Sequence, residues 1–172
     1  MYKMNFRQNS EEFYVIVEIP MNNDPVKYEF KKEVGMITVD RFMQTAMYYP
    51  CNYGFIPNTL SGDGDPVDVL VVSRYPVIPG SVIKSRPIGV LIMEDESGVD
   101  EKIIAVPVSK VDCSFDDVQS ISDVDQMLIK RIRHFFENYK ALENGKWVKI
   151  VGFEDKAQAV ALINSGFVNF SS

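Results

Sequence analysis

The first two-thirds of the sequence is a series of short strand-like segments with no helical segment between them, and this pattern constrains the fold most. The segments are rich in β-branched and aromatic residues, and turns with Gly, Pro, Asn and Asp separate them. They cover residues 13–20, 26–32, 35–42, 67–73, 81–93 and 102–109. Strands joined by turns favour a closed β-barrel over a parallel, doubly wound sheet. The first three segments are expected to form a meander.

The pattern changes in the last third of the chain, where apolar residues recur every three or four positions, as on one face of an amphipathic helix. They are Leu128, Ile132, Phe135, Phe136, Tyr139 and Leu142. Ser122 and Asp125 resemble a capping box at the start of this helix, and Gly145 is expected to end it. A second helix is expected over 156–164, ending at Gly166. The predicted fold is therefore α+β, mainly β with two helices in the C-terminal region.

Length and composition indicate one domain, over residues 1–172. The chain has 46% hydrophobic and 12% aromatic residues, enough for a single core, and no repeat or linker divides it. Its net charge of -6 argues against nucleic acid as a partner, which requires a broad basic face. Without a stretch of about 20 apolar residues or an apolar leader, no membrane association is expected, and a cytoplasmic location is predicted.

The cysteines and the histidine do not indicate a zinc site. Cys51 and Cys113 lack the CxxC spacing of zinc ligands, and His134 is the only histidine. We interpret both thiols as reduced packing residues and not as a disulfide.

Three aspartates crowd the entrance to an apolar, strand-like segment. Asp63, Asp65 and Asp68 lie within six residues, and carboxylates this close beside a core resist ionisation unless a cation lies between them. Pro66 stiffens the loop and biases Asp65 toward an extended conformation. An EF-hand is excluded, because Val67 and Asp68 would stand where that loop needs an oxygen ligand and a glycine. A different kind of cation site is predicted.

A second acidic segment, MEDESGVDEK at 93–102, lies between two predicted strands. Its acidic residues are Glu94, Asp95, Glu96, Asp100 and Glu101. By itself, an acidic hairpin tip is usually a solvated turn. Two acidic loops on one small barrel instead favour a shared site for several hard, oxygen-liking cations, with Mg²⁺ as the first choice.

Cationic and phenolic side chains form a third group. They are Lys27, Arg41, Lys102, Lys140, Tyr48, Tyr49, Tyr53 and Tyr139, with Glu29 on the same strand face as Lys27. Taken singly, each reads as a surface charge or a core tyrosine. Together they could bind phosphate oxygens while carboxylates hold cations. These residues indicate a metal-dependent enzyme acting on a small phosphate. A two-metal phosphomonoesterase or nuclease, or a barrel that binds Ca²⁺ or oligonucleotides, are the alternatives.

The run DGDPVDVLV at 63–71 resembles the signature of the family I soluble inorganic pyrophosphatases. Companion motifs follow the family's order, so that the resemblance covers 13–152. They are EIPMNNDPVKYE, VDRFMQTAMYYPCNYGFIPNTLSGDGDPVDVL, RPIGVLIMEDESGVDEKIIAVP and HFFENYKALENGKWV. The length fits the short bacterial type. One departure is Asn138, which stands where some bacterial members carry a histidine near the subunit interface.

The resemblance implies a five-stranded, OB-like closed barrel that hydrolyses pyrophosphate to two phosphates. It implies several Mg²⁺ ions, a metal-activated water without a covalent intermediate, and a homohexamer. The implied metal ligands are Asp63, Asp68 and Asp100 for the tightest ion, Asp95 and Glu29 for ions that arrive with substrate, and Glu18 as a further acid. The implied substrate-binding residues are Lys27, Arg41, Lys102, Tyr139 and Lys140. Asp65 is implied as the general base, and Tyr53 as a tyrosine that contacts the reacting site.

Overall fold

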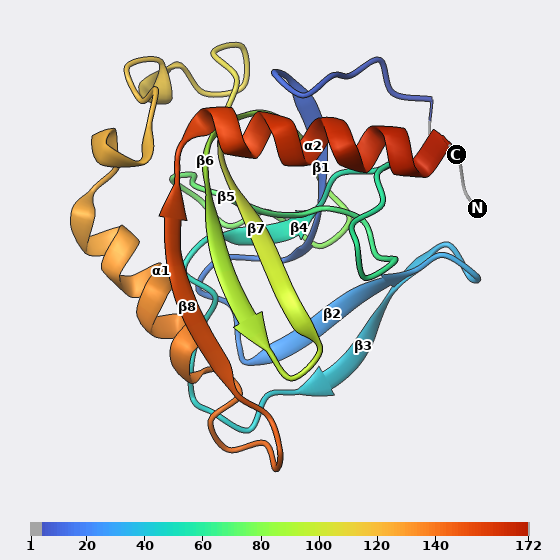
Figure 1. Cartoon of the computed structure of the whole chain (residues 1–172), viewed down its shortest axis with the longest axis vertical. Helices are drawn as coiled ribbons and strands as arrows, with labels where there is room; N and C mark the ends of the chain where they lie inside the picture. The colour runs from blue at the N-terminus through green and yellow to red at the C-terminus, as the bar shows by residue number, and fades with distance from the viewer. Residues whose placement is uncertain (1–4, 172) are drawn as a thin grey trace.

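The chain, described over residues 5–171 in a computed structural model, closes five strands into a ring (Figure 1). The ring runs through β1 (Phe13–Ile19), β4 (Asn52–Phe55), β5 (Asp68–Val71), β7 (Gly98–Pro107) and β6 (Val82–Asp95). β6 pairs with β1 and completes the circle. Neighbours are antiparallel except β5 and β7, which are parallel. The expected mainly β fold, with five strands closed on themselves, is confirmed.

The ring strands are buried on both faces, which their near-continuous apolar runs require. Successive side chains of a strand point to opposite faces. In β5, Val69 and Leu70 accordingly belong to two different clusters of buried side chains, and Ile103 and Ile104 of β7 divide in the same way. One cluster includes residues of the helix α1 (Gln126–Asn138), and the other includes residues of α2 (Lys156–Ser171). Each helix therefore covers a different part of the core.

Helix α1 confirms the amphipathic pattern up to Phe136, but Leu142 lies beyond the helix and is exposed, and the start and end of the helix differ from expectation. It buries Ile132, Phe135 and Phe136. Its N-cap is Asp125, whose carboxylate accepts a hydrogen bond from the Met127 amide at 3.0 Å. The capping box lies one turn earlier, between Ser120 and Asp123 of the short 3₁₀ helix η2 (Ile121–Asp123), so the expected Ser122–Asp125 box is wrong. The helix ends at Asn138, and Gly145 lies in the following turn with φ +74°.

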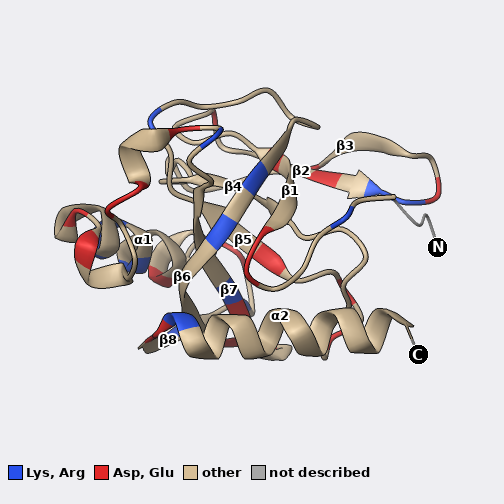
Figure 2. Ribbon diagram, turned by 90° about the horizontal axis from the view of Figure 1, so that it is seen from above, with Lys and Arg blue, Asp and Glu red and all other residues tan. Residues whose placement is uncertain are grey.

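Helix α2 continues through Gly166, which was expected to end it. A Cβ atom at Gly166 would lie 2.7 Å from Val67 Cγ2 and 3.2 Å from Thr59 Cβ. This glycine therefore serves close packing against the chain around β5 and does not terminate the helix. Figure 2 shows α2 without charge along most of its length, and only Lys156 at its first position is charged. Of the helices within residues 5–171, none is long and apolar enough to cross a membrane.

The expected meander is wrong, because β1 pairs with β4 and β6 and not with the next segment. β2 (Val26–Lys31) and β3 (Met36–Phe42) form a separate two-stranded sheet, here called the hairpin. Both of its strands are half-buried or exposed throughout, so they lack the apolar faces that a place in the ring requires. Two strands were not expected from the sequence: β4 of the ring, and β8 (Val148–Glu154), which pairs with the outer edge of β6.

The second acidic segment is mostly strand. Asp95 ends β6 and Asp100 lies on β7, with only residues 96–97 between the two strands. The two cysteines also differ from each other. Both are free, as expected, and Cys51 is buried in the core. Cys113 is exposed, however, because it lies in a short surface turn, so its predicted packing role is wrong.

Candidate active site

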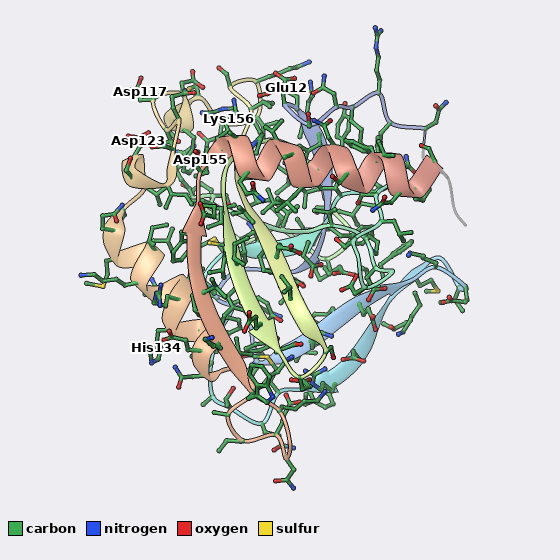
Figure 3. The ribbon with its side chains drawn as sticks, viewed as in Figure 1. Glu12, Asp117, Asp123, His134, Asp155 and Lys156 are labelled. Atoms are coloured by element: carbon green, nitrogen blue, oxygen red, sulfur yellow. The ribbon has the colours of Figure 1, made fainter. Side chains whose placement is uncertain are left out.

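A pocket of about 390 Å³ lies between the ring, the hairpin and the end of α1. Every catalytic, substrate-binding and metal-ligating residue that the resemblance implies lines it, from Glu18 on β1 to Lys140 beyond α1. Tyr48, Glu94 and Glu101, which the residue pattern also grouped with the site, are not among its lining residues. The lining also includes Glu96 and Lys146, which the resemblance does not assign to the site. Glu96 belongs to the noted acidic segment, whereas Lys146 gave no local signal, since it lies in an ordinary polar turn. His134 lies on α1, is exposed, and is not part of the pocket lining (Figure 3).

Lys102 joins two of the predicted metal ligands. Asp100 and Lys102 are two residues apart on β7 and therefore on one face, and the parallel register places Asp68 of β5 opposite Lys102. The Lys102 ammonium donates to Asp68 Oδ2 at 2.5 Å and to Asp100 Oδ1 at 2.7 Å. Burial opposes the charged form, but the Asp68 and Asp100 carboxylates raise the pKa of Lys102. The lysine is thus a buried cation held by two carboxylates.

The remaining acids leave an excess of negative charge on this side of the pocket. Burial raises the pKa of Asp65, with the Asp63 carboxylate adding to the effect, and burial also raises that of Asp100 despite Lys102. The donors are carboxylate oxygens, without histidine or cysteine, which fits a hard divalent cation. Among residues 5–171, however, no three Asp, Glu, His or Cys side chains already form a metal cluster. Metal binding would therefore need these side chains to converge.

The loop that carries Asp63 and Asp65 is tied to the ring through Thr59. The Thr59 hydroxyl accepts from the Val67 amide at 2.9 Å and donates to the Ile56 carbonyl at 2.6 Å. Within the loop, the Asp65 amide donates to Asp63 Oδ1 at 3.0 Å. Asp65 itself is exposed at the pocket's edge. The backbone of this loop is therefore held while the carboxylate of Asp65 stays accessible.

Glu18 is a buried acid on β1. It is 8% exposed, and its Oε1 accepts from the Phe30 amide of the hairpin at 2.7 Å. Burial raises the pKa of Glu18 to about 8. A single carboxyl group thus connects the ring to the hairpin and holds a proton more readily than an ordinary glutamate.

The hairpin and the turn after α1 supply cations. Arg41 Nη1 donates to Asp40 Oδ2 at 2.8 Å, and Lys27 Nζ lies 3.4 Å from the same oxygen. Across the pocket, Lys140 Nζ donates to Asp95 Oδ2 at 2.8 Å. Figure 2 shows charges of both signs on the hairpin. Lys27, Arg41 and Lys140 are all partly exposed, and each is paired with a carboxylate beside it.

Aromatic rings form the wall beside these charges. The Tyr49 ring centroid lies 5.1 Å from that of Tyr53 and 4.5 Å from that of Phe135, and Tyr139 stacks on Phe135 at 5.2 Å. Burial raises the pKa of Tyr49 and of Tyr53 well above the usual value. Their phenol groups therefore stay protonated at neutral pH and can act only as neutral donors or acceptors.

Comparison with known proteins gives one consistent result. The family model described as inorganic pyrophosphatase matches residues 15–171. The inorganic pyrophosphatase of Rickettsia felis is 66% identical over 164 residues, with 95% of each chain covered. That of Escherichia coli is 56% identical over 157 residues, covering 91% of this chain and 89% of the relative. The solved inorganic pyrophosphatase of Helicobacter pylori superposes with a TM-score of 0.95 at 44% identity, covering 99% of this chain and 100% of that chain.

Proposed function

The chain belongs to the bacterial family I inorganic pyrophosphatases, and from this membership we propose that its pocket binds pyrophosphate together with Mg²⁺. The enzyme class, hydrolysis of pyrophosphate, is that of its relatives at 56–66% identity. One observation carries the proposal: a single pocket combines excess carboxylates with Lys, Arg and Tyr donors. A multiply charged anion that arrives with divalent cations needs both kinds of group.

Asp63, Asp68 and Asp100 would hold the tightest Mg²⁺ ion, with Asp68 also reaching a second. Asp95, Glu29 and Glu18 would complete the set for the ions that accompany substrate. When bound, Mg²⁺ lowers the pKa of a coordinated water and offsets the charge of the phosphate oxygens. These assignments follow the family's motif and agree with the oxygen-only donor set of the pocket.

Asp65 would act as the general base. Its carboxylate is accessible, its amide is fixed by Asp63, and burial with the neighbouring Asp63 charge raises its pKa. A raised pKa brings a carboxylate closer to the value at which it accepts a proton from water at neutral pH. Asp65 would thus remove or orient the proton of the attacking water, without forming a covalent bond to phosphorus.

Lys27, Arg41, Lys102, Tyr139 and Lys140 would bind the phosphate oxygens. Phosphoryl transfer passes through a loose transition state with its charge spread over oxygens, so positioning and charge stabilisation provide most of the catalysis. Tyr53, whose protonated phenol is a donor at neutral pH, would contact the reacting phosphate. None of these groups would form a covalent bond to the substrate.

Three further properties stay predictions. We expect one domain, whose proposed range of 1–172 includes residues 1–4 and 172, outside the described part of the chain. We also expect a homohexamer and a cytoplasmic location. Light scattering of the purified protein in solution tests the oligomer directly, and a mass of one or two chains would contradict the hexamer.

Phosphate release from pyrophosphate is the experiment that tests the function. We expect fast release with Mg²⁺, little with EDTA, and little from nitrophenyl phosphate. Release from nitrophenyl phosphate alone would favour the phosphomonoesterase alternative. Salt-sensitive binding of single-stranded oligonucleotide, with no release from either substrate, would favour the binding-barrel alternative.

A further inference from the structure

The hairpin carries proposed substrate-binding cations although little packing holds it in place. β2 and β3 pair only with each other among the described residues, and neither contains a fully buried residue. The apolar contacts of the hairpin with the core come from β2, where Tyr28 packs against the cluster that includes α1 and the Phe30 ring centroid lies 5.9 Å from that of Phe55. β3, which carries Arg41, contributes no residue to either core cluster of the described chain, so specific polar contacts must set where the Arg41 guanidinium stands.

Arg41 is held by two carboxylates that come from different elements. Asp40, its neighbour on β3, accepts from Nη1, whereas Glu143 lies in the turn after α1 and accepts from Nε at 3.3 Å through Oε1. The Glu143 side chain is only 15% exposed, against 35% for Arg41. The Nη2 group makes no hydrogen bond within residues 5–171, so its N–H groups remain for an anion.

A second contact ties the same turn to the chain just after β3. The Thr45 hydroxyl donates to the Tyr139 carbonyl at 3.1 Å, and both residues are buried. The Glu143 amide donates to the Lys140 carbonyl at 2.9 Å and closes the turn. Glu143 thus lies on the short segment that also carries Tyr139 and Lys140, the phosphate donors proposed for the opposite wall of the pocket.

We propose that Glu143 is a positioning residue: by accepting the Arg41 Nε–H, it sets the distance between the hairpin arginine and the Tyr139–Lys140 segment, so that both can bind one pyrophosphate. This inference rests on the proposed function. A carboxylate beside a phosphate-binding arginine partly neutralises it, so charge alone would make Glu143 a competitor of the substrate. Only a geometric role makes its removal weaken substrate binding.

Three variants separate the effect of the length of the Glu143 side chain from the effect of its charge. Glu143→Gln keeps a carbonyl oxygen that accepts the Nε–H but loses the charge, whereas Glu143→Asp keeps the charge but withdraws it by one methylene. Glu143→Ala loses both. Positioning predicts that Gln stays near the wild type and that Asp resembles Ala. A competing charge predicts that both Gln and Ala lower KM.

The experiment measures KM and kcat for pyrophosphate at saturating Mg²⁺, with a urea unfolding midpoint for each variant. We expect Glu143→Ala to raise KM roughly tenfold with kcat changed less than about twofold, since misplacement of a binding group weakens substrate binding first. In an Arg41→Ala background, Glu143→Ala should raise KM no further. Glu137→Ala, which breaks the exposed pair with Arg133 on α1, is the matched control and should leave KM unchanged.

An unchanged or lower KM in Glu143→Ala, or an equal rise in the Arg41→Ala background, would overturn the inference while the wild type remains active. A wild type that releases no phosphate from pyrophosphate would instead overturn the proposed function, and the inference with it. If Glu143→Ala unfolds at the assay temperature, the contrast between the Gln and Asp variants decides.

Discussion

Lys102 and Arg41 present positive charges to the same pocket, but the protein holds them in different ways. Lys102 lies on a ring strand with its side chain 6% exposed, and its ammonium contacts two carboxylates. Arg41 lies on the hairpin with its side chain 35% exposed, and its partners come from its own strand and from the turn after α1.

This difference separates contacts that stabilise the fold from contacts that position substrate-binding groups. On the ring side, strand register places Asp68, Asp100 and Lys102, so the same contacts that build the sheet also build the site. On the hairpin side, side-chain bridges place the cations. We therefore expect changes on the ring side to reduce both stability and activity, and changes on the hairpin side to reduce substrate binding with the fold intact.

The largest expected effect comes from a change at Asp65. Because Asp65 lies on an exposed loop, this variant tests whether an exposed residue can be essential for turnover while contributing little to stability. Asp65→Asn should lower kcat by roughly 10² to 10⁴, the range for loss of a general base, because the amide cannot take a proton. Stability and Mg²⁺ binding should change little. The control is Asp117→Asn, since Asp117 is exposed on the chain before α1 (Figure 3) and is not among the residues that line the pocket. Turnover close to the wild type at saturating Mg²⁺ would remove Asp65 from the mechanism.

The next effect tests the ring side. Lys102→Met should lower the free energy of unfolding in EDTA by about 3–5 kcal/mol, because Asp68 and Asp100 lose their shared counterion. Added Mg²⁺ should restore part of this loss. Urea denaturation in EDTA and in Mg²⁺ measures the loss in free energy of unfolding and its recovery. As control, Lys146→Met removes an ammonium with a 42% exposed side chain paired to Glu96 and should cost less than about 1 kcal/mol. Equal losses in the two variants would contradict the comparison.

Glu18 connects the two sides, and its titration should appear in the pH dependence of stability. Its pKa is raised from 4.5 to about 8 in the folded protein. Between these values the folded state keeps a proton that the unfolded chain releases, so this stabilisation is full below pH 4.5 and is lost as the pH rises through 8. The unfolding temperature in EDTA should therefore fall between pH 5 and 8, and Glu18→Gln should flatten that fall. Parallel curves for the two proteins would show that Glu18 is not protonated in the folded state.

The smallest effect concerns the two thiols, whose reactivity compares a buried position with an exposed one. Cys51 is fully buried, and burial raises its pKa to about 12, so it should not react with a disulfide reagent at pH 8 until urea unfolds the chain. The exposed Cys113 should react at once. Labelling Cys113 should leave turnover unchanged, because it lies outside the pocket lining. Immediate reaction of two thiols per chain would mean that the core around Cys51 opens readily.

Local patterns predicted much of this protein. Alternation and turn chemistry identified four of the five ring strands but not the short β4, and the three-to-four periodicity identified α1. Among the missed features, the misplaced capping box is a local error, because Ser120 and Asp123 lie only two residues before the expected pair. Others depend on distant contacts: Thr59 and Val67 lie against Gly166 within α2, and β2–β3 lies outside the ring because β1 pairs elsewhere. Propensity and spacing report on neighbours in the chain, so they cannot report such contacts.

The same division applies to the site. The sequence by itself determined which acids crowd the loop at Asp63–Asp68 and that Asp95 and Asp100 belong to a second acidic segment. It placed Asp100 in a loop before the strand expected from residue 102, so the face of β7 that Asp100 and Lys102 share was not predicted. Only the tertiary structure decided that Lys102 meets Asp68, through the parallel register of β5 and β7, and that Arg41 meets Glu143, 102 positions away. Those meetings depend on how the ring closes and on where the hairpin lies over it. Both follow from long-range packing of the whole chain.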